Sequence, residues 1–440
     1  MSLRARQAAN PSPVNRLLQS IPWPWRVASF LFFAAGLNYA DRAALSSVIP
    51  PLRAELGATD VHIGIMGLLF LWSYAIASPF AGNLADRYSR SRIVVWSLVV
   101  WSLITLATGF ASSVTSLFVL RFALGIAESL YLPAAGALLG DHHGPATRGR
   151  ATGVHILGLN LGVFFGGAFA GLLAEHYGWR LSFWILGGAG IGLAMFSRFF
   201  IADAPKAVRV VETVKARDAY AYLLRVTSFH LLLFSAVVAG VASWIFFTWL
   251  PLYFIENYGM NLGAAGLAGV ALFKGPAVAG IVIGGWLSDR MARRGARNRV
   301  MIKALSYLAS GPFLFVFLLG PEFGVVAVML AASSVIRSAG VPSEHPIVCD
   351  VVPPEFRSTA IGLLNTCGTA AGGVGVLLTG LFKEDLGLNA IFGGSSFLFI
   401  IAGAGLLVAY YIAMPRDLAR ARAYETATGS TAGVPLDSGR

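Results

Sequence analysis

Twelve apolar windows, each long enough to cross a lipid bilayer as a helix, constrain this fold more than any other feature. A helix of about 20 residues spans the hydrocarbon core and satisfies its own backbone hydrogen bonds there. The windows lie at 27–50, 61–82, 93–112, 115–139, 151–173, 181–201, 229–255, 263–287, 300–319, 323–349, 359–381 and 391–413. Hydrophobic residues make up 56% of the chain and charged residues 12%, whereas a soluble domain carries about 25% charged residues. The sequence therefore predicts an all-α integral membrane protein with twelve transmembrane helices.

The distribution of charge predicts how the chain divides and which side each loop faces. The predicted parts are a basic tail, a six-helix bundle, a linker, a second six-helix bundle and a disordered tail, at residues 1–26, 27–202, 203–228, 229–414 and 415–440. The polar first segment leads into a spanning window, so we expect no cleavable signal peptide. With both termini cytoplasmic, 25 of the 33 Lys and Arg lie in cytoplasmic segments, 3 in external loops and 5 inside the windows. The positive-inside rule then sets the orientation, and the net charge of +12 faces lipid headgroups rather than nucleic acid. We expect a cell membrane, the inner one if the source is bacterial.

The two halves of the chain repeat the same short patterns. Gly82-Asn-Leu-Ala-Asp86-Arg87 follows the second window, and Gly285-Trp-Leu-Ser-Asp289-Arg290 follows the eighth. After the fourth and tenth windows the same spacing recurs in Asp141, Arg148 and Ala151 and in Asp350, Arg357 and Ala360. Asn160 and Asn365 begin the glycine-rich parts of the fifth and eleventh windows. Two pseudo-symmetric six-helix bundles of this kind are typical of a transporter whose binding site lies between the halves.

Five ionisable residues from four predicted helices lie at a similar depth in the bilayer. With a rise of 1.5 Å per residue, each is about 20–22 Å from the cytoplasmic end of its helix. They are Asp41, Arg42, Glu128, Lys274 and Arg337, and Arg121 and Glu344 lie seven residues from this layer. A charge at the bilayer centre is costly, so the layer indicates a functional site. Static ion pairs that hold the bundle together are the alternative.

The sign of this layer predicts the class of cargo. Its charge is +1 with both carboxylates ionised and +3 with both protonated, and Arg121 adds another positive charge. Protonation therefore strengthens the binding of an anion, and the two ligands are thermodynamically linked. Arginine also suits bidentate contact with a carboxylate or phosphate. We predict that Asp41 and Glu128 carry protons and that Arg42, Arg121, Lys274 and Arg337 bind an organic anion. The roles of Lys274 and Arg337 rest on depth alone.

Two motifs carry a resemblance to a known family. The loop Gly82-x-x-x-Asp86-Arg87-x-x-Arg90-x-Arg92 is similar to the signature of the major facilitator superfamily, from which it departs at Ser89. Over about residues 27–413 the chain looks like a member of that family. The resemblance implies a gating role on the cytoplasmic side for this loop and its repeat, and we extend that role to the charged residues after the fourth and tenth windows. The gating set is Asp86, Arg87, Arg90, Asp141, Arg148, Asp289, Arg290, Asp350 and Arg357. Capping of helix ends is the alternative.

A second motif resembles one branch of the superfamily. Asn38-Tyr39-Ala40-Asp41-Arg42, with Arg121-x-x-x-Gly125-x-x-Glu128, is similar to the anion:cation symporters, which include sugar-acid permeases. The resemblance implies proton coupling at the two carboxylates and substrate contact at the arginines. Spinster-like lipid transporters share a similar motif, so transport of amphipathic lipid anions such as lysophospholipids is the alternative function. Tyr39, Asn160 and Asn365 are predicted to line the substrate path, although the asparagines could instead bridge helices.

Other features weigh against further classes of function. The chain contains no Gly-Lys dipeptide and hence no phosphate-binding loop of the Walker type, so an ion gradient is the expected energy source. We expect no enzyme activity and no cofactor besides protons. A membrane-embedded sensor or enzyme is a third hypothesis, which the gating-type loops in both halves do not favour. His155 is predicted to be a packed polar residue, and Glu344 to be solvated. Trp244, Phe247, Trp249 and Tyr253 either line a cavity or anchor a helix at the membrane interface. We predict a monomer.

Overall fold

The computed structural model describes residues 22–203 and 216–428, and every regular element within these ranges is a helix. The first half contains α2 (Trp23–Ser47), α3 (Ile49–Leu56), α4 (Asp60–Arg87), α5 (Arg90–Thr108), α6 (Val114–Ser129), α7 (Tyr131–His142), α8 (Pro145–Tyr177), α9 (Trp179–Phe196) and η2 (Ser197–Phe199). The second half contains α10 (Ala216–Leu223), α11 (Thr227–Tyr258), α12 (Leu262–Phe273), α13 (Gly275–Ala292), α14 (Asn298–Ser310), η3 (Gly311–Leu319), α15 (Phe323–Ser338), η4 (Val341–Ser343), α16 (Glu344–Val351), η5 (Pro354–Phe356), α17 (Arg357–Val408), η6 (Ala409–Ala413) and α18 (Met414–Thr428). Most of the predicted N-terminal tail, part of the linker and the end of the C-terminal tail lie outside the described residues. The prediction of a disordered tail from residue 415 is wrong up to residue 428, because this stretch belongs to α18.

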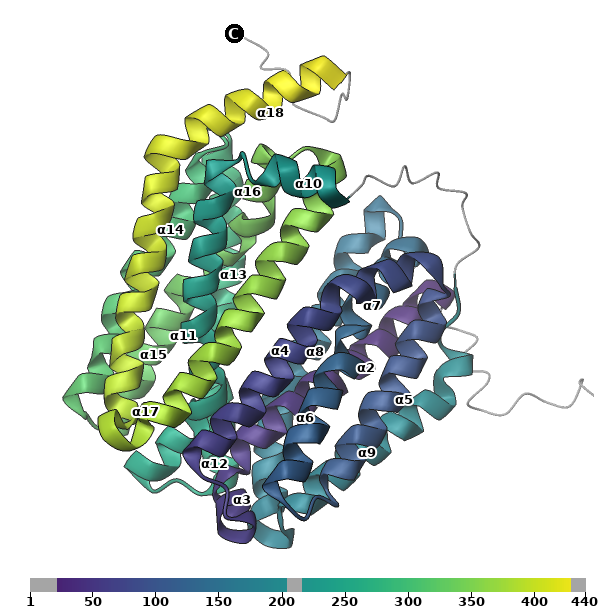
Figure 1. Ribbon diagram of the computed structural model, residues 1–440, viewed down its shortest axis with the longest axis vertical. Helices are drawn as coiled ribbons and strands as arrows, with labels where there is room; N and C mark the ends of the chain where they lie inside the picture. Colours follow the sequence, from purple (N-terminus) through teal and green to yellow (C-terminus); the bar gives the residue numbers. More distant parts are fainter. Residues whose placement is uncertain (1–21, 204–215, 429–440) are drawn as a thin grey trace, which may run out of the picture.

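The helices agree with the predicted twelve crossings. Ten segments of the described chain are long and apolar enough to span a membrane. One of them, Pro354–Ala421, contains two of the predicted windows. The chain reverses between these windows at Gly387 of α17, whose φ of 73° is a conformation that glycine adopts most easily. Figure 1 shows the two parts of α17 running in opposite directions from a turn at the bottom of the view, with α11 between them. Helix α2 is not among the ten, and it contains the charged pair Asp41 and Arg42.

Four of the crossings are broken, and a proline explains each break. A proline ring clashes with the carbonyl four residues earlier and removes one hydrogen bond of the helix. In three of the breaks the proline lies four residues after the last residue of the helix before it: Pro51 after α2, Pro133 after α6 and Pro342 after α15. In the fourth, Pro276 lies four residues after the penultimate residue of α12. The breaks after α6, α12 and α15 come within two residues of the charged positions 128, 274 and 337. Side chains from other helices bond to carbonyls near two of them: Ser97 donates to Ala127 (2.6 Å) and Ser334 to Phe273 (2.6 Å).

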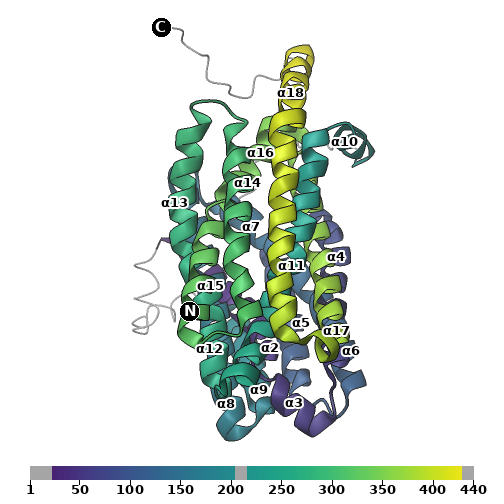
Figure 2. The ribbon, with the colours of Figure 1, turned by 90° about the vertical axis from the view of Figure 1, so that its left-hand side faces the viewer.

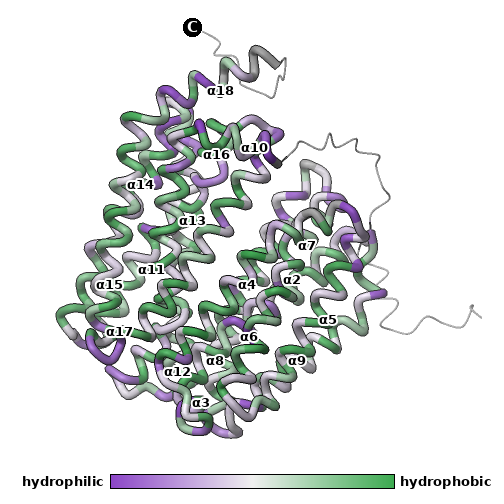
Figure 3. The backbone as a smooth tube through the Cα atoms, viewed as in Figure 1, coloured by the Kyte–Doolittle hydropathy of each residue, from purple (hydrophilic) through white to green (hydrophobic). Residues whose placement is uncertain are grey.

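The two groups of six crossings meet at one end of the molecule and diverge at the other (Figure 1). We name the diverging end, which carries α10, α16 and α18, the linker end, and the end that carries α3 the far end. Figure 2 shows α18 extending beyond the other helices at the linker end. Hydrophilic stretches gather at both ends while the middle of the helices is largely apolar (Figure 3), as expected for a bilayer-spanning bundle.

Glycines allow the halves to touch closely on the far-end side. Gly64 and Gly67 of α4 meet the backbone of Leu377 and the side chain of Val376 in α17. On the other side of the molecule, Gly167 of α8 lies against Gly266 of α12. An added Cβ at Gly64, Gly67 or Gly266 would press on the opposite half, so small residues allow this close contact.

Candidate functional site

The predicted proton and anion residues of the first half form one buried cluster. Arg42 of α2 donates from Nε to Oε2 of Glu128 in α6, at 2.7 Å. The neighbouring Asp41 accepts a hydrogen bond from the Thr105 hydroxyl of α5, at 2.9 Å. Asp41 is 2% exposed and Glu128 is fully buried. The structure therefore brings three predicted residues together, with Thr105 as a partner that the sequence analysis did not name.

Three aromatic rings surround the Arg42 guanidinium. Its Cζ lies 4.7 Å from the ring centres of Tyr39 and Tyr74 and 5.1 Å from that of Phe70. Such rings attract a cation through their quadrupoles and exclude water from it. Tyr39 was predicted to line the path, and the structure places it directly against Arg42. Phe70 and Tyr74 come from α4. The sequence analysis did not name them, because their place within an apolar window does not show that they face Arg42.

Arg121 completes the cluster from two helical turns away. Its side chain is 3% exposed, packs 5.9 Å from the Phe183 ring and exerts an attraction on Glu128 and Asp41. Among the described residues, its Nε and Nη2 have no hydrogen-bond partner, and neither does Nη2 of Arg42. Buried donors normally have partners. These two guanidinium groups therefore retain capacity to bind an anion.

A cavity of about 30 Å³ adjoins the cluster and lies between the two halves. Arg42, Arg121 and Phe70 contribute to its wall from the first half, and Trp244, Phe247 and Thr248 of α11 from the second. Of the two alternatives for the aromatic residues of this helix, cavity lining holds for Trp244 and Phe247. Trp249 and Tyr253 fit neither alternative, because they are at most 1% exposed and pack inside the second bundle.

Lys274 and Arg337 form a second cluster in the other half. Both lie over the Phe273 ring, with Lys274 Nζ at 5.6 Å and Arg337 Cζ at 4.7 Å from its centre. Arg337 also lies 5.7 Å from the ring of Phe399. Neither residue lines the cavity beside Arg42. The predicted single layer is thus two clusters at similar depth, because depth along a helix does not determine the direction in which a side chain points.

Sequence reasoning missed the partner of Glu344. This carboxylate accepts from Lys303 of α14 at 2.5 Å, and the Lys303 side chain is 1% exposed. Glu344 remains 29% exposed, so the expectation of solvation holds in part, but its pairing with Lys303 was not expected. The signal was available, because a lysine inside an apolar window requires a counter-charge.

At the linker end, the predicted gating residues show that the two halves repeat in detail. Arg90 pairs with Asp141 and Arg299 with Asp350 (2.9 Å), and both pairs join residues 51 positions apart. Each bond lies within one half. Arg299 was not among the predicted gating residues, although its position in the second half is equivalent to that of Arg90 in the first.

Two further residues of the predicted gating set cap helix ends in identical fashion, which is the alternative role given to the set. Arg148 donates to the carbonyls five and eight residues earlier, and Arg357 does the same. Such bonds satisfy carbonyls at the ends of α7 and α16. Of the remaining residues, Arg87 and Asp289 are exposed, Arg290 lies 5.4 Å from the Trp286 ring, and the Asp86 side chain lies outside the described part.

The remaining predicted polar residues do not join either cluster. Asn160 donates to the Ile156 carbonyl of its own helix at 2.9 Å, and Asn365 is exposed. His155 is buried against the Tyr131 hydroxyl at 3.0 Å, in line with the prediction of a packed polar residue. Neither asparagine makes a hydrogen bond between helices within the described residues.

At the far end, four charged residues join the halves. Lys383 of the second half contacts Asp60 of the first at 3.2 Å and Glu256 of its own half at 2.6 Å. Arg53 of the first half contacts Glu256 of the second at 3.3 Å and also pairs with Asp60. The sequence analysis did not identify this network, since loop charges carry no periodic signal.

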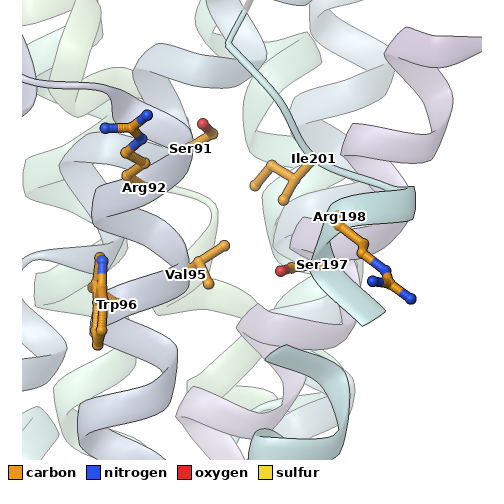
Figure 4. A pocket seen from close by; sticks show the side chains of 7 residues that line it. All are labelled: Ser91, Arg92, Val95, Trp96, Ser197, Arg198 and Ile201. Atoms are coloured by element: carbon orange, nitrogen blue, oxygen red, sulfur yellow. The ribbon is translucent and has the colours of Figure 1, made fainter. Parts of the chain in front are cut away.

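A further hollow of about 220 Å³ lies at the linker end between α5 and η2 (Figure 4). Ser91, Val95, Ser197 and Ile201 face it, whereas the guanidinium groups of Arg92 and Arg198 point away from it on opposite sides. It contains none of the predicted proton or anion residues.

Twelve apolar helices in two repeated bundles, with buried charges beside the space between them, define an integral membrane transporter rather than an enzyme. The sequence profile of the Major Facilitator Superfamily matches residues 31–302 and 275–436, so the chain belongs to that family.

Named relatives and solved structures support this assignment. The chain is 28% identical over 391 residues to a probable sulfoacetate transporter of Cupriavidus necator, covering 82% of this chain and 87% of the relative. It is 27% identical over 402 residues to a hexuronate transporter of Bacillus subtilis, covering 89% and 93%. A bacterial homologue of the lysosomal transporter Spinster, in an inward-facing conformation, has the same fold with a TM-score of 0.74 at 20% identity, covering 90% of this chain and 98% of that one.

Proposed function

We propose that this transporter is a proton-coupled symporter of a small organic anion and that it works by alternating access. The observation that carries the proposal is the bond between Arg42 and Glu128 beside the cavity between the halves. A residue that serves both as the partner of a titratable acid and as a wall of the cavity can link protons to an anion.

The charges of the first cluster cancel when both of its acids are ionised. Asp41 and Glu128 then balance Arg42 and Arg121. One proton makes the cluster +1, and a second makes it +2. An anion near the arginines is therefore bound more tightly by the protonated cluster, and by reciprocity the bound anion favours protonation.

Arg42 can exchange one partner, the Glu128 carboxylate, for another, the carboxylate of the cargo. While Glu128 is ionised, it occupies the Nε donor of Arg42. Once Glu128 is protonated, that donor and the unpartnered Nη2 are available as a pair for a carboxylate. The unpartnered Nε and Nη2 of Arg121 offer a second fork on the same cavity.

Contacts between the halves explain access from one side at a time. The far end is closed by the charge network and by the glycine contacts, whereas the bundles diverge at the linker end. With cytoplasmic termini, as the positive-inside rule predicts, this conformation faces inward. Rocking of one bundle against the other would open the far end and bring the linker-end gating residues together.

The cavity needs to widen before it holds an organic anion. A volume of about 30 Å³ has room for one or two waters. Trp244 and Phe247 form its wall from the second half, so movement between the halves changes its size.

The names of the relatives favour an acid as cargo. They include transporters of sulfoacetate and hexuronate and a probable galactarate/D-glucarate transporter of Escherichia coli, 24% identical over 433 residues. Amphipathic lipid anions remain the alternative cargo. We further propose that the protein works as a monomer in the cell membrane, with protons as its coupling ion.

Reconstitution into liposomes tests this proposal. We expect an inward proton gradient to drive accumulation of at least one acid from a panel of sugar acids, sulfonates and aromatic acids. Asp41→Asn and Glu128→Gln should abolish accumulation while leaving the protein folded. Arg150→Gln, at an exposed position outside the cluster, is the matched control. Failure of every acid to accumulate, or full accumulation by both carboxylate variants, would overturn the proposal.

A further inference from the structure

The second cluster, formed by Lys274 and Arg337, contains no acid within the described part of the chain, whereas the arginines of the first cluster lie beside Asp41 and Glu128. Lys274 and Arg337 lie over one ring, and the ion pairs of the described residues include neither of them. Glu344, the nearest acid along the chain to Arg337, is bonded to Lys303. Two cations thus remain without a carboxylate at mid-depth, where an unpaired charge is costly.

Packing along α12 shows which face of this helix meets the first half. Gly266 of this helix lies against Gly167 in the first half, and Val270 packs with Ala43 and Val163 of the first half. Lys274 lies one turn beyond Val270 on the same face. The stripe that contacts the first half therefore continues to Lys274, towards the linker end, where the halves diverge.

Tyr39 connects the surroundings of the two clusters. Its ring lies against Arg42 and also packs on the group formed by Ala43, Val163 and Val270. Lys274 follows that group by one turn, and both Lys274 and Arg337 are half-buried rather than fully enclosed. The two cation pairs thus belong to opposite halves, and Tyr39 and Val270 lie between their surroundings.

From this arrangement we infer that the cargo is a dianion, with one acid group bound by Arg42 and Arg121 and the other by Lys274 and Arg337. This inference rests on the proposed function and specifies its substrate class. With Glu128 protonated, as the proposed function requires, the first cluster is +1 and the second is +2. A monoanion at Arg42 would leave both charges of the second cluster without a counter-charge, whereas a dianion neutralises charge in both clusters, and this is the physical basis of selection.

Such a cargo would also connect the two halves, because one molecule would bind residues of both. An acid held by one cluster alone leaves the other cluster facing open space. A diacid contacts both bundles at once, and it therefore favours the conformation in which they close around it.

Matched acids test the inference on the wild-type protein. Binding is measured for saturated dicarboxylates and sugar diacids of four to six carbons, each against the acid of the same length in which a hydroxymethyl group replaces one carboxylate. We expect the best diacid to bind roughly tenfold or more tightly than its partner, the usual effect of a charge-assisted hydrogen-bond pair. Equal binding of diacid and monoacid would overturn the inference.

Variants locate the second acid group. Lys274→Met and Arg337→Met should reduce the preference for the diacid to about threefold or less while monoacid binding changes little. The double variant with Lys303→Met and Glu344→Gln removes a charge pair from the same bundle without changing its net charge, and should keep the preference. If wild-type protein accumulates monoacids but never prefers diacids, the inference fails and the proposed symport stands. If no acid accumulates, both fail.

Discussion

The far-end network allows a quantitative test of how the two halves are held together. Lys383→Met removes the contact with Asp60 across the halves and the contact with Glu256. The Lys383 and Asp60 side chains are about 10% exposed, so the loss falls near the upper range for surface pairs, about 1 kcal/mol. Such a change shifts the ratio of open to closed far ends by about fivefold. The glycine contacts remain and limit the effect.

Cysteine labelling measures that ratio. Val376 is fully buried where α17 meets Gly67 of α4, so Val376→Cys reacts with a maleimide when the far end opens. The assay uses a background in which Cys349 and Cys367 are replaced by Ser. We expect Lys383→Met to raise the labelling rate about fivefold.

A matched control lies at the same end of the molecule. Arg180 pairs with Glu55, and both belong to the first half. Arg180→Met therefore weakens a salt bridge without favouring either conformation, and labelling should change less than about twofold. The reasoning is refuted if Lys383→Met leaves the rate unchanged, or if the control raises it equally.

Three further predictions follow from other parts of the structure. Arg42→Met leaves Glu128 buried without its partner and should cost about 3–5 kcal/mol of stability, whereas the double variant with Glu128→Gln should regain most of the unfolding temperature but no transport. Gly162→Leu should prevent close packing of α8 on Gly36 of α2 and lower expression and unfolding temperature, while Gly136→Leu, where an added Cβ meets open space, should be tolerated. Hydrogen bonds from Arg180 and Trp179 lower the pKa of the Glu55 carboxyl at the far end. Its stabilisation is present above the unfolded pKa of about 4.3 and is lost as pH falls through the lower folded value. The difference in unfolding temperature between wild type and Glu55→Gln should therefore be seen at neutral pH, begin to shrink near the unfolded pKa of about 4.3 and vanish below the lower folded value.

Periodic features of the chain were predictable from the sequence. Windows of apolar residues located the crossings, and the repeated Asp and Arg spacing anticipated that Asp141 and Asp350 have equivalent surroundings. Close contact of Asp41, Arg42 and Glu128 followed from depth together with a motif. The broken helices were only partly within reach: a proline follows each break, but Pro79 and Pro251 lie inside the unbroken helices α4 and α11.

Features that depend on rotation about a helix axis or on long-range pairing were not predictable in this way. Lys274 and Arg337 have the expected depth, but their side chains gather on Phe273 rather than beside Arg42. Lys383 and Asp60 are 323 positions apart, and only the packing of α4 on α17 brings them together. A lone charge in a loop contains no information about such a partner.

The dependence of anion binding on pH tests the central claim most directly. For an acid that the wild-type protein accumulates, the dissociation constant is measured over roughly pH 5 to 8 in wild type and in the Asp41→Asn/Glu128→Gln double variant. If a proton must displace Glu128 from Arg42 before the anion binds, wild-type binding should weaken up to tenfold per pH unit for each coupled proton. The double variant should bind with nearly constant affinity. Equal pH dependence in both proteins, or none in wild type, would contradict this account.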